Sequence, residues 1–191
     1  RYVFVRIDSQ LRQNAHSNPS LADMATTLTA AYIEGRQLTV AHVGDSRLYR
    51  YRCSEQRLLR LTEDQTPASA EDFDPEPTVA LGYGIQSGDV TVDTYALEDS
   101  EALLLCTDGL WREADDALIE SVIKGSPSPA LAAERLTRAA NQRGGRGNLA
   151  CIVVHVGQPG FANDESLDSA YPPPVAPVSA GSRSAPFPLP R

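Results

Sequence analysis

The feature that most constrains the fold is an unbroken apolar run, Ala102–Cys106, that leads directly into Thr107-Asp108-Gly109. Five consecutive apolar residues bounded by polar ones are typical of a short strand buried on both faces. The glycine after the aspartate lets the chain bend away from the strand. The run therefore predicts a central strand that presents the Asp108 carboxylate at its carboxyl end.

Further β-rich runs are separated by turn signals. Met24–Ile33 and Gln37–Val43 flank the turn signal Glu34-Gly35-Arg36, and Arg47–Arg52 follows with alternating side chains. Consecutive short strands joined by tight turns form an antiparallel meander. Other strands are expected at Leu58–Leu61, Val90–Leu97 and Leu149–Val156.

Two segments have helical spacing. Glu113–Lys124 places apolar residues on one face and acidic residues in its first turn, where the helix dipole favours negative charge. Pro129 opens a second helix, which Gly144-Gly145 ends. The sequence therefore predicts a mixed α and β fold.

The start of the chain fits two structures. Apolar residues recur every four positions, as in an amphipathic helix, at Val3, Ile7 and Leu11. Tyr2–Val5 would equally fit a strand. Because the first residue is Arg1 and the only methionine is Met24, inside an apolar segment, we expect that an upstream segment precedes this chain.

Composition changes after Gly157. Residues 158–191 hold eight of the 14 prolines, with scattered serine, alanine and glycine. Such a segment cannot bury enough apolar surface to offset its ordering entropy. We therefore expect a folded domain over residues 1–157 and a disordered tail or linker over 158–191. The Pro172–Pro177 stretch contains a PxxP pattern, so a weak ligand for an aromatic groove is an alternative to a solvated spacer.

Charge and cysteine content exclude several classes. With 25 acidic and 17 basic side chains the net charge is -8, which argues against general binding to nucleic acid or anionic lipid. The longest apolar runs are far shorter than the roughly 20 residues that cross a bilayer, so no membrane helix is expected. The three cysteines are odd in number and widely spaced, which indicates a reducing, cytoplasmic compartment.

Three short motifs lie at the ends of predicted strands. They are Gly44-Asp45-Ser46-Arg47, Thr107–Trp111 and Gly144–Asn148. Each of them alone is usually a turn. Their order and spacing carry more information than any one of them.

Five ordered segments resemble the later motifs of the PP2C-type metal-dependent protein serine/threonine phosphatases, over about residues 1–157. They are Met24–Leu28, Val40–Arg47, Leu61–Asp64, Leu104–Trp111 and Gly147–Val154. The resemblance implies an α+β fold, an α-β-β-α sandwich of two antiparallel sheets, incomplete at the N-terminus. It also implies two Mn²⁺ or Mg²⁺ ions that activate a water, and a phosphoprotein substrate produced by an opposing Ser/Thr kinase.

The resemblance assigns site residues one at a time. Asp108 corresponds to the metal-ligating aspartate of the Ser/Thr-Asp-Gly motif, and Asp45 to the aspartate of Gly-Asp-Ser-Arg, which in some members helps to bind a third, weaker metal. Hard divalent cations prefer such carboxylate oxygens. Gly109 and Asn148 are expected beside these ligands without coordinating a metal.

Departures from the family pattern predict a weakened metal centre. Gly147 stands where the family has a ligating aspartate, and glycine has no side chain to coordinate an ion. Arg112 occupies a position where some members have another aspartate, and its cation would repel a metal if it pointed inward. Asp64-Gln65 replaces Asp-His. The family's phosphate-binding arginine and bridging aspartate have no counterpart in this chain.

Two functional hypotheses follow. This chain is the C-terminal two-thirds of a working phosphatase and has negligible activity alone, or it belongs to a degenerate relative that keeps the sandwich as a binding or regulatory module. Asp45 and Asp108 favour the first hypothesis, and Gly147 favours the second. An unrelated α+β domain is a third alternative.

Overall fold

The computed structural model describes residues 1–66 and 77–157, and the statements below concern these residues. The helices are α1 (Tyr2–Ser17), the 3-10 turn η1 (Pro19–Leu21), α2 (Asp108–Trp111), α3 (Asp116–Lys124) and α4 (Pro129–Gln142). The strands are β1 (Leu28–Glu34), β2 (Gln37–Val43), β3 (Arg47–Arg52), β4 (Arg57–Arg60), β5 (Thr91–Ala96), β6 (Glu101–Cys106) and β7 (Cys151–Val156). The proposed tail, with its PxxP pattern, lies outside the described residues.

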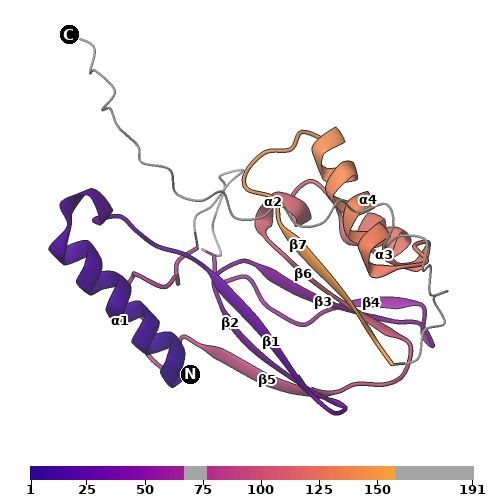
Figure 1. Cartoon of the computed structure of the whole chain (residues 1–191), viewed down its shortest axis with the longest axis horizontal. Helices are drawn as coiled ribbons and strands as arrows, with labels where there is room; N and C mark the ends of the chain where they lie inside the picture. The colour runs from indigo at the N-terminus through magenta and orange to yellow at the C-terminus, as the bar shows by residue number, and fades with distance from the viewer. Residues whose placement is uncertain (67–76, 158–191) are drawn as a thin grey trace, which may run out of the picture.

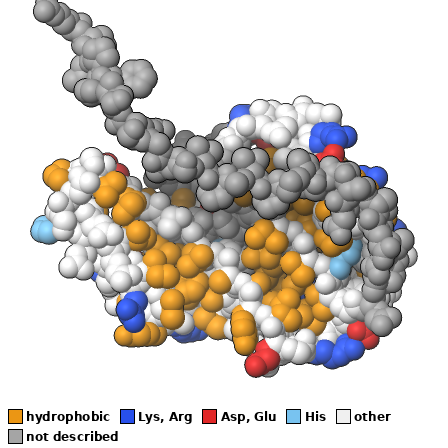
Figure 2. All heavy atoms as spheres, in the orientation of Figure 1, with side chains coloured by type: hydrophobic (Ala, Val, Ile, Leu, Met, Phe, Trp, Pro, Cys, Tyr) orange, Lys and Arg blue, Asp and Glu red, His pale blue; other side chains and the backbone are white. Residues whose placement is uncertain are grey.

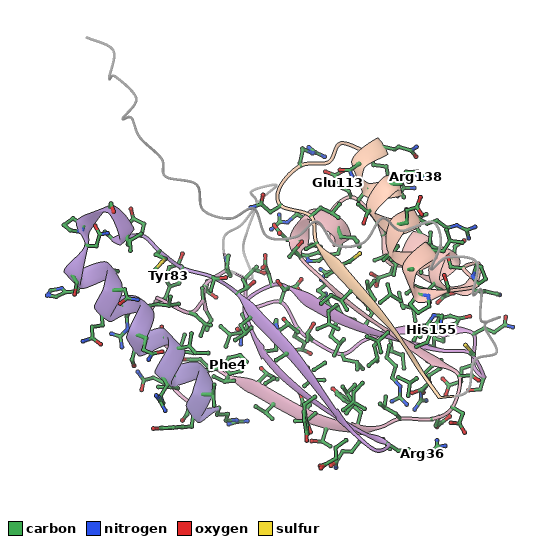
Figure 3. All side chains as sticks on the ribbon, viewed as in Figure 1. Phe4, Arg36, Tyr83, Glu113, Arg138 and His155 are labelled. Atoms are coloured by element: carbon green, nitrogen blue, oxygen red, sulfur yellow. The ribbon has the colours of Figure 1, made fainter. Side chains whose placement is uncertain are left out.

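The described strands form two antiparallel sheets, ordered β1-β2-β5 and β4-β3-β6-β7. Helix α1 covers the outer face of the first sheet, and α3 and α4 cover the outer face of the second (Figure 1). Phe4 points from α1 toward the first sheet and is buried there (Figure 3). The predicted α-β-β-α sandwich is therefore confirmed.

Side-chain alternation in the strands explains the layers. Leu38 and Val40 of β2 pack with Leu103 of β6 between the sheets, whereas Val43 packs with Phe4 under α1. In β6 the neighbours of Leu103 face the opposite way and pack with α3 and α4. The prediction that this strand is buried on both faces is thus correct.

The N-terminal segment is a helix, α1, which decides between the helix and the strand that the sequence allowed there. Two element boundaries differ clearly from the sequence expectation. Strand β1 begins at Leu28, because the preceding segment makes only an isolated bridge between Thr26 and Leu81. The expected helix at Glu113 begins instead at Asp116, because the Asp115 side chain accepts a hydrogen bond from the Leu118 amide and caps it.

Strands β1 and β7 lie at the ends of their sheets among the described residues. A pocket of about 310 Å³ lies between them, lined by Thr27, Ser46 and Leu105 among others. Hydrophobic side chains gather on this face of the molecule (Figure 2). Tyr32 of β1 and Ile152 of β7 are each more than half exposed. The expectation that this sandwich lacks the N-terminal strands of the family fold remains a prediction.

None of the helices in the described segments combines the length and the apolar character needed to span a membrane.

A buried ion pair lies between the sheets. The Arg50 guanidinium donates to Glu101 Oε1 from Nε at 3.0 Å and to the Ala96 carbonyl at 2.7 Å. The two charged side chains are only 4% and 2% exposed. Glu101 also accepts a hydrogen bond from the Glu98 amide, so the pair fixes the connection from β5 to β6. A buried pair of this kind destabilises strongly when one partner is removed, because the other charge is left in low dielectric.

Arg50→Leu should therefore lower the free energy of unfolding by about 3–5 kcal/mol, measured by urea denaturation. The double variant Arg50→Leu/Glu101→Leu should recover most of that loss, because neither charge of the pair is left alone and Arg52, which lies 3.5 Å from Glu101, keeps its contact with Glu55. Arg36→Gln, which removes an exposed pair with Asp99, is the control and should change the midpoint little. A single Arg50 variant as stable as the wild type would contradict the argument.

Candidate functional site

Asp108 lies where β6 ends and α2 begins. Thr107 is the N-cap residue of α2, and its hydroxyl donates to the Asn148 carbonyl at 2.7 Å and accepts from the Ala150 amide at 2.9 Å. The end of β6 is thereby fastened to the segment that leads into β7. The Asp108 side chain is 36% exposed, so it remains accessible from solvent.

Asp45 lies in the loop that crosses from β2 in the first sheet to β3 in the second. Its side chain is only 7% exposed. Its backbone carbonyl accepts a hydrogen bond from Trp111 Nε1 at 3.0 Å. The Gly-Asp-Ser-Arg loop and the Thr-Asp-Gly loop, 63 residues apart in sequence, thus meet at one end of the sandwich, as the resemblance implied.

Arg112 points into this end of the sandwich. Its Nε lies 3.3 Å from Asp108 Oδ2, and a terminal guanidinium nitrogen lies 3.6 Å from Asp45 Oδ2. The arginine side chain is 14% exposed. Arg112 thus points inward, which is the condition under which its cation was expected to repel a metal. Its guanidinium group contacts both carboxylates that were assigned as metal ligands.

The electrostatics of Asp45 reflect these neighbours. Burial raises the pKa of Asp45 above its ordinary value, and the negative charge of Asp108 raises it further, while the Arg112 guanidinium lowers it. The pKa remains raised overall, so a negative charge at Asp45 is costly without a nearby cation. Arg112 is the cation that the structure places there.

A second arginine organises the neighbouring loop. Arg47 donates to both Asp64 oxygens, and its guanidinium lies 3.5 Å from the centre of the Trp111 ring. It also donates to Tyr49, whose hydroxyl donates to Asp116 at 3.0 Å. No contacts were assigned to Arg47 from the sequence, and this network was missed. The signal that could have found it is the opposite charge of Arg47 and Asp64, which are the last residues of two of the five ordered segments.

Gln65, in the place of the family's histidine, also ties loops together. Its amide oxygen accepts from the Gly44 backbone at 2.7 Å, and its amide nitrogen donates to the Asp89 carbonyl at 2.8 Å. Its own backbone nitrogen donates to the Gly44 carbonyl. These contacts position the loop that carries Asp45.

The third motif lies against the second through two glycines. A Cβ built on Gly109 would come within 2.8 Å of the Asn148 carbonyl oxygen, so only glycine allows this approach. A Cβ on Gly147 would lie 3.8 Å from Gly109, in ordinary contact. Gly147 has φ +83°, a conformation that side chains other than those of asparagine and aspartate rarely adopt. Position 147 is therefore adjacent to the Asp108 motif.

Glu113 anchors the loop of the third motif. It is buried, and its carboxylate accepts from Arg146 Nε at 3.0 Å, while Arg143 donates to its backbone carbonyl (Figure 3). The sequence placed Glu113 in the first turn of a helix, which was wrong because this carboxylate instead holds the 143–148 loop.

The described residues do not bring together enough carboxylates to bind two metal ions. Residues 1–66 and 77–157 contain no group of three or more His, Cys, Asp or Glu side chains that could hold an ion. Asp45 and Asp108 share Arg112 as a counter-charge, and Gly147 offers no donor. The residues present therefore do not fit a two-ion centre on their own, and the assignment of Asp45 and Asp108 as ligands stays a prediction.

The fold and the site form one arrangement. In an α-β-β-α sandwich, an aspartate at the end of a central strand faces a Gly-Asp-Ser loop that comes from the other sheet.

Comparison with known proteins identifies the family. A family model described as protein phosphatase 2C matches residues 2–153. A serine/threonine phosphatase, stp, of Listeria welshimeri is 32% identical over 162 residues, covering 78% of this chain and 63% of the relative. The Mycobacterium tuberculosis phosphatase PstP is 30% identical over 161 residues, covering 78% of this chain and 31% of the relative. The chain belongs to the protein phosphatase 2C family.

Solved structures agree on the fold. PppA of Pseudomonas aeruginosa superposes with a TM-score of 0.70 at 25% identity, covering 80% of this chain and 66% of PppA. The catalytic domain of PstP in complex with two manganese ions superposes with a TM-score of 0.68 at 28% identity, covering 79% of this chain and 67% of that domain. This chain therefore spans less than two thirds of the Listeria relative, less than a third of PstP, and about two thirds of each solved chain.

Gly109→Ala should destabilise the protein by about 1–3 kcal/mol, because its methyl group would press on the Asn148 backbone. Gly88→Ala is the matched control, since a Cβ there meets no atom within 4 Å. Urea denaturation followed by the emission of Trp111 would measure both. Equal stability of the two variants would show that the two motifs are not in close contact.

His42 makes folding stability depend on pH. It is buried, hydrogen-bonds to Thr29 at 2.8 Å and donates from Nε2 to the Glu63 carbonyl at 3.0 Å. Burial lowers the pKa of His42 below its ordinary 6.5, despite the hydrogen bonds that raise it.

Below about pH 6.5 the unfolded chain takes up a proton at His42 that the folded chain resists, so stability should fall as pH falls through this window. His42→Gln should flatten the dependence of unfolding free energy on pH between about 7 and 5. His16→Gln, at an exposed position of α1, is the control. An unchanged slope in the His42 variant would contradict the assignment.

Proposed function

We propose that the whole protein is a protein serine/threonine phosphatase, which hydrolyses phosphoserine and phosphothreonine in phosphoproteins, and that this chain contributes the C-terminal part of its catalytic domain. The observation that carries the proposal is the meeting of Asp108 and Asp45 at one end of a protein phosphatase 2C sandwich. The relatives named above as serine/threonine phosphatases support the reaction class.

The described residues alone are proposed to lack metal-dependent hydrolysis. Two carboxylates that share one arginine do not provide the several fixed oxygen ligands that hard divalent ions need. Family members use Mn²⁺ or Mg²⁺ to supply a nucleophilic water. Among the described residues Asp108 and Asp45 are the ones proposed to face such ions, and further carboxylates must come from outside the described residues.

A second function is favoured by one specific observation. Arg112 contacts both carboxylates and offsets part of their charge, and Gly147 replaces a third ligand. A domain of this kind would keep the sandwich as a phosphoprotein-binding or regulatory module without turnover. The two functions differ in a simple way, since only the first predicts release of phosphate.

Partners and location are part of the same proposal. A phosphoprotein substrate implies an opposing Ser/Thr kinase. The Pro172–Pro177 stretch, outside the described residues, is proposed as a solvated spacer, with a weak PxxP ligand as the alternative. Cys53, Cys106 and Cys151 are free thiols, and burial raises the pKa of Cys106 to about 12, which keeps it protonated and unreactive. Free thiols of this kind support a reducing, cytoplasmic location.

The 191-residue chain should show no Mn²⁺-dependent hydrolysis of a small aryl phosphate, whereas the whole protein should release phosphate from a phosphothreonine peptide. Asp108→Asn in the whole protein should reduce that rate at least about 100-fold, as expected when a metal-facing carboxylate is lost. Tight peptide binding without turnover by the whole protein would favour the regulatory module. Clear turnover by the 191-residue chain, abolished by Asp108→Asn, would refute the proposed division of the site.

The chain also offers a gain-of-ligand test. Gly147→Asp in the whole protein should tighten Mn²⁺ binding, measured by calorimetry, because position 147 adjoins Gly109 and aspartate tolerates a positive φ better than most residues. Gly147→Asn is the matched control, with the same shape and no charge. Equal affinities of the wild type and the aspartate variant would count against position 147 facing the ions.

A further inference from the structure

We propose that Arg112 is the built-in counter-cation of the Asp45–Asp108 pair, and that a divalent ion reaches these two carboxylates only by displacing its guanidinium group. The ordinary expectation for the pair is a metal site. The structure instead places a tethered organic cation at the same point.

The geometry supports competition for the same oxygens. Arg112 approaches Oδ2 of Asp108 at 3.3 Å and Oδ2 of Asp45 at 3.6 Å, so one guanidinium contacts both residues. A metal ion binding either oxygen would have to come within about 2.0–2.6 Å of it. A metal ion and the guanidinium group cannot occupy that space together, because their charges repel and the guanidinium is already within van der Waals distance of both carboxylate oxygens.

The surroundings hold Arg112 in place. Its guanidinium carbon lies 4.9 Å from the centre of the Trp111 ring, within the range of a cation–π contact. Trp111 is itself fixed, because its Nε1 donates to the Asp45 carbonyl and Arg47 contacts its ring at 3.5 Å. An arginine held at three points is preorganised, so its displacement by an ion carries a free-energy cost.

Charge explains why a cation is needed at this point. The Asp45 side chain is only 7% exposed, and the Asp108 carboxylate contacts the same guanidinium group. Without Arg112 two carboxylates would face each other at the junction of the two loops, and their repulsion would separate β6 from the β2–β3 loop. Arg112 thus does for the loops what a metal ion would do, without any ion.

This inference concerns the 191-residue chain and does not depend on whether the whole protein hydrolyses phosphoesters. A working enzyme would need its ions to displace Arg112, whereas a regulatory module would keep Arg112 in place. The test therefore uses stability and metal binding of the chain and needs no measurement of turnover.

The experiment compares the wild-type chain with Arg112→Gln in MnCl₂ titrations. Trp111 is the only tryptophan, so its emission reports on this site alone. The metal-free Arg112→Gln chain should melt at a lower temperature than the wild type, and Mn²⁺ should raise its melting temperature and change its emission. The wild type should require at least about tenfold more Mn²⁺ for the same response.

Three further variants separate charge from shape. Arg112→Lys keeps a cation and should restore both the metal-free melting temperature and the weak Mn²⁺ response. Arg112→Gln/Asp108→Asn should lose the Mn²⁺ response, because it removes a ligand. Arg52→Gln is the matched control, since this arginine contacts Glu55 and Glu101 at the opposite end of β3 and should leave the Mn²⁺ titration unchanged.

Two outcomes would overturn the proposal. One is an Arg112→Gln chain with the metal-free stability of the wild type. The other is an Mn²⁺ response that is equal in the wild type and in Arg112→Gln, including no response in either. The Arg112→Lys variant keeps the proposal falsifiable if the glutamine variant does not fold, because lysine should preserve the fold and still bind Mn²⁺ no more tightly than the wild type.

Discussion

The burial of β6 on both faces is the constraint on which the rest of the structure depends. Its side chains alternate between the space between the sheets and the layer of α3 and α4. Because it is central, β6 pairs with β3 on one side and β7 on the other, and both antiparallel neighbours begin at the end of the sandwich where β6 ends. The carboxylate after β6 therefore meets the other two motifs as a result of strand pairing rather than of loop flexibility.

Much of the fold could be predicted, because apolar periodicity records burial. The β6 run, the turn at Gly35 and the helix opened by Pro129 each follow from local chemistry. What escaped prediction depends on partners distant in sequence. Nothing in the alternating strand indicates that Arg50 pairs with Glu101, 51 residues away. Glu113 was expected in the first turn of a helix, but it binds Arg146.

The location of the candidate site could be predicted from the sequence, but the side-chain contacts within it could not. The motif order placed Asp45 and Asp108 at one end of the sandwich, and the structure brings them together there. The direction of Arg112 could not be read from sequence, because a position four residues after Asp108 can face either solvent or the site. The direction of Arg112 is decided by its burial beside the carboxylates of Asp108 and Asp45, the second of which has a raised pKa. These are properties of three-dimensional packing.

The register of β6 with β7 has a consequence for the evolution of this site. Cys106 lies opposite Cys151, and the Thr107 hydroxyl donates a hydrogen bond to the Asn148 carbonyl, just before β7. The position of Gly147 beside Gly109 therefore depends on the number of residues between Gly147 and the start of β7. A single-residue insertion or deletion between 147 and 151 would shift that segment by about 3.3 Å or turn the apolar face of β7 to solvent. Substitutions can alter the chemistry at this end of the molecule, but length changes there are expected to be purged.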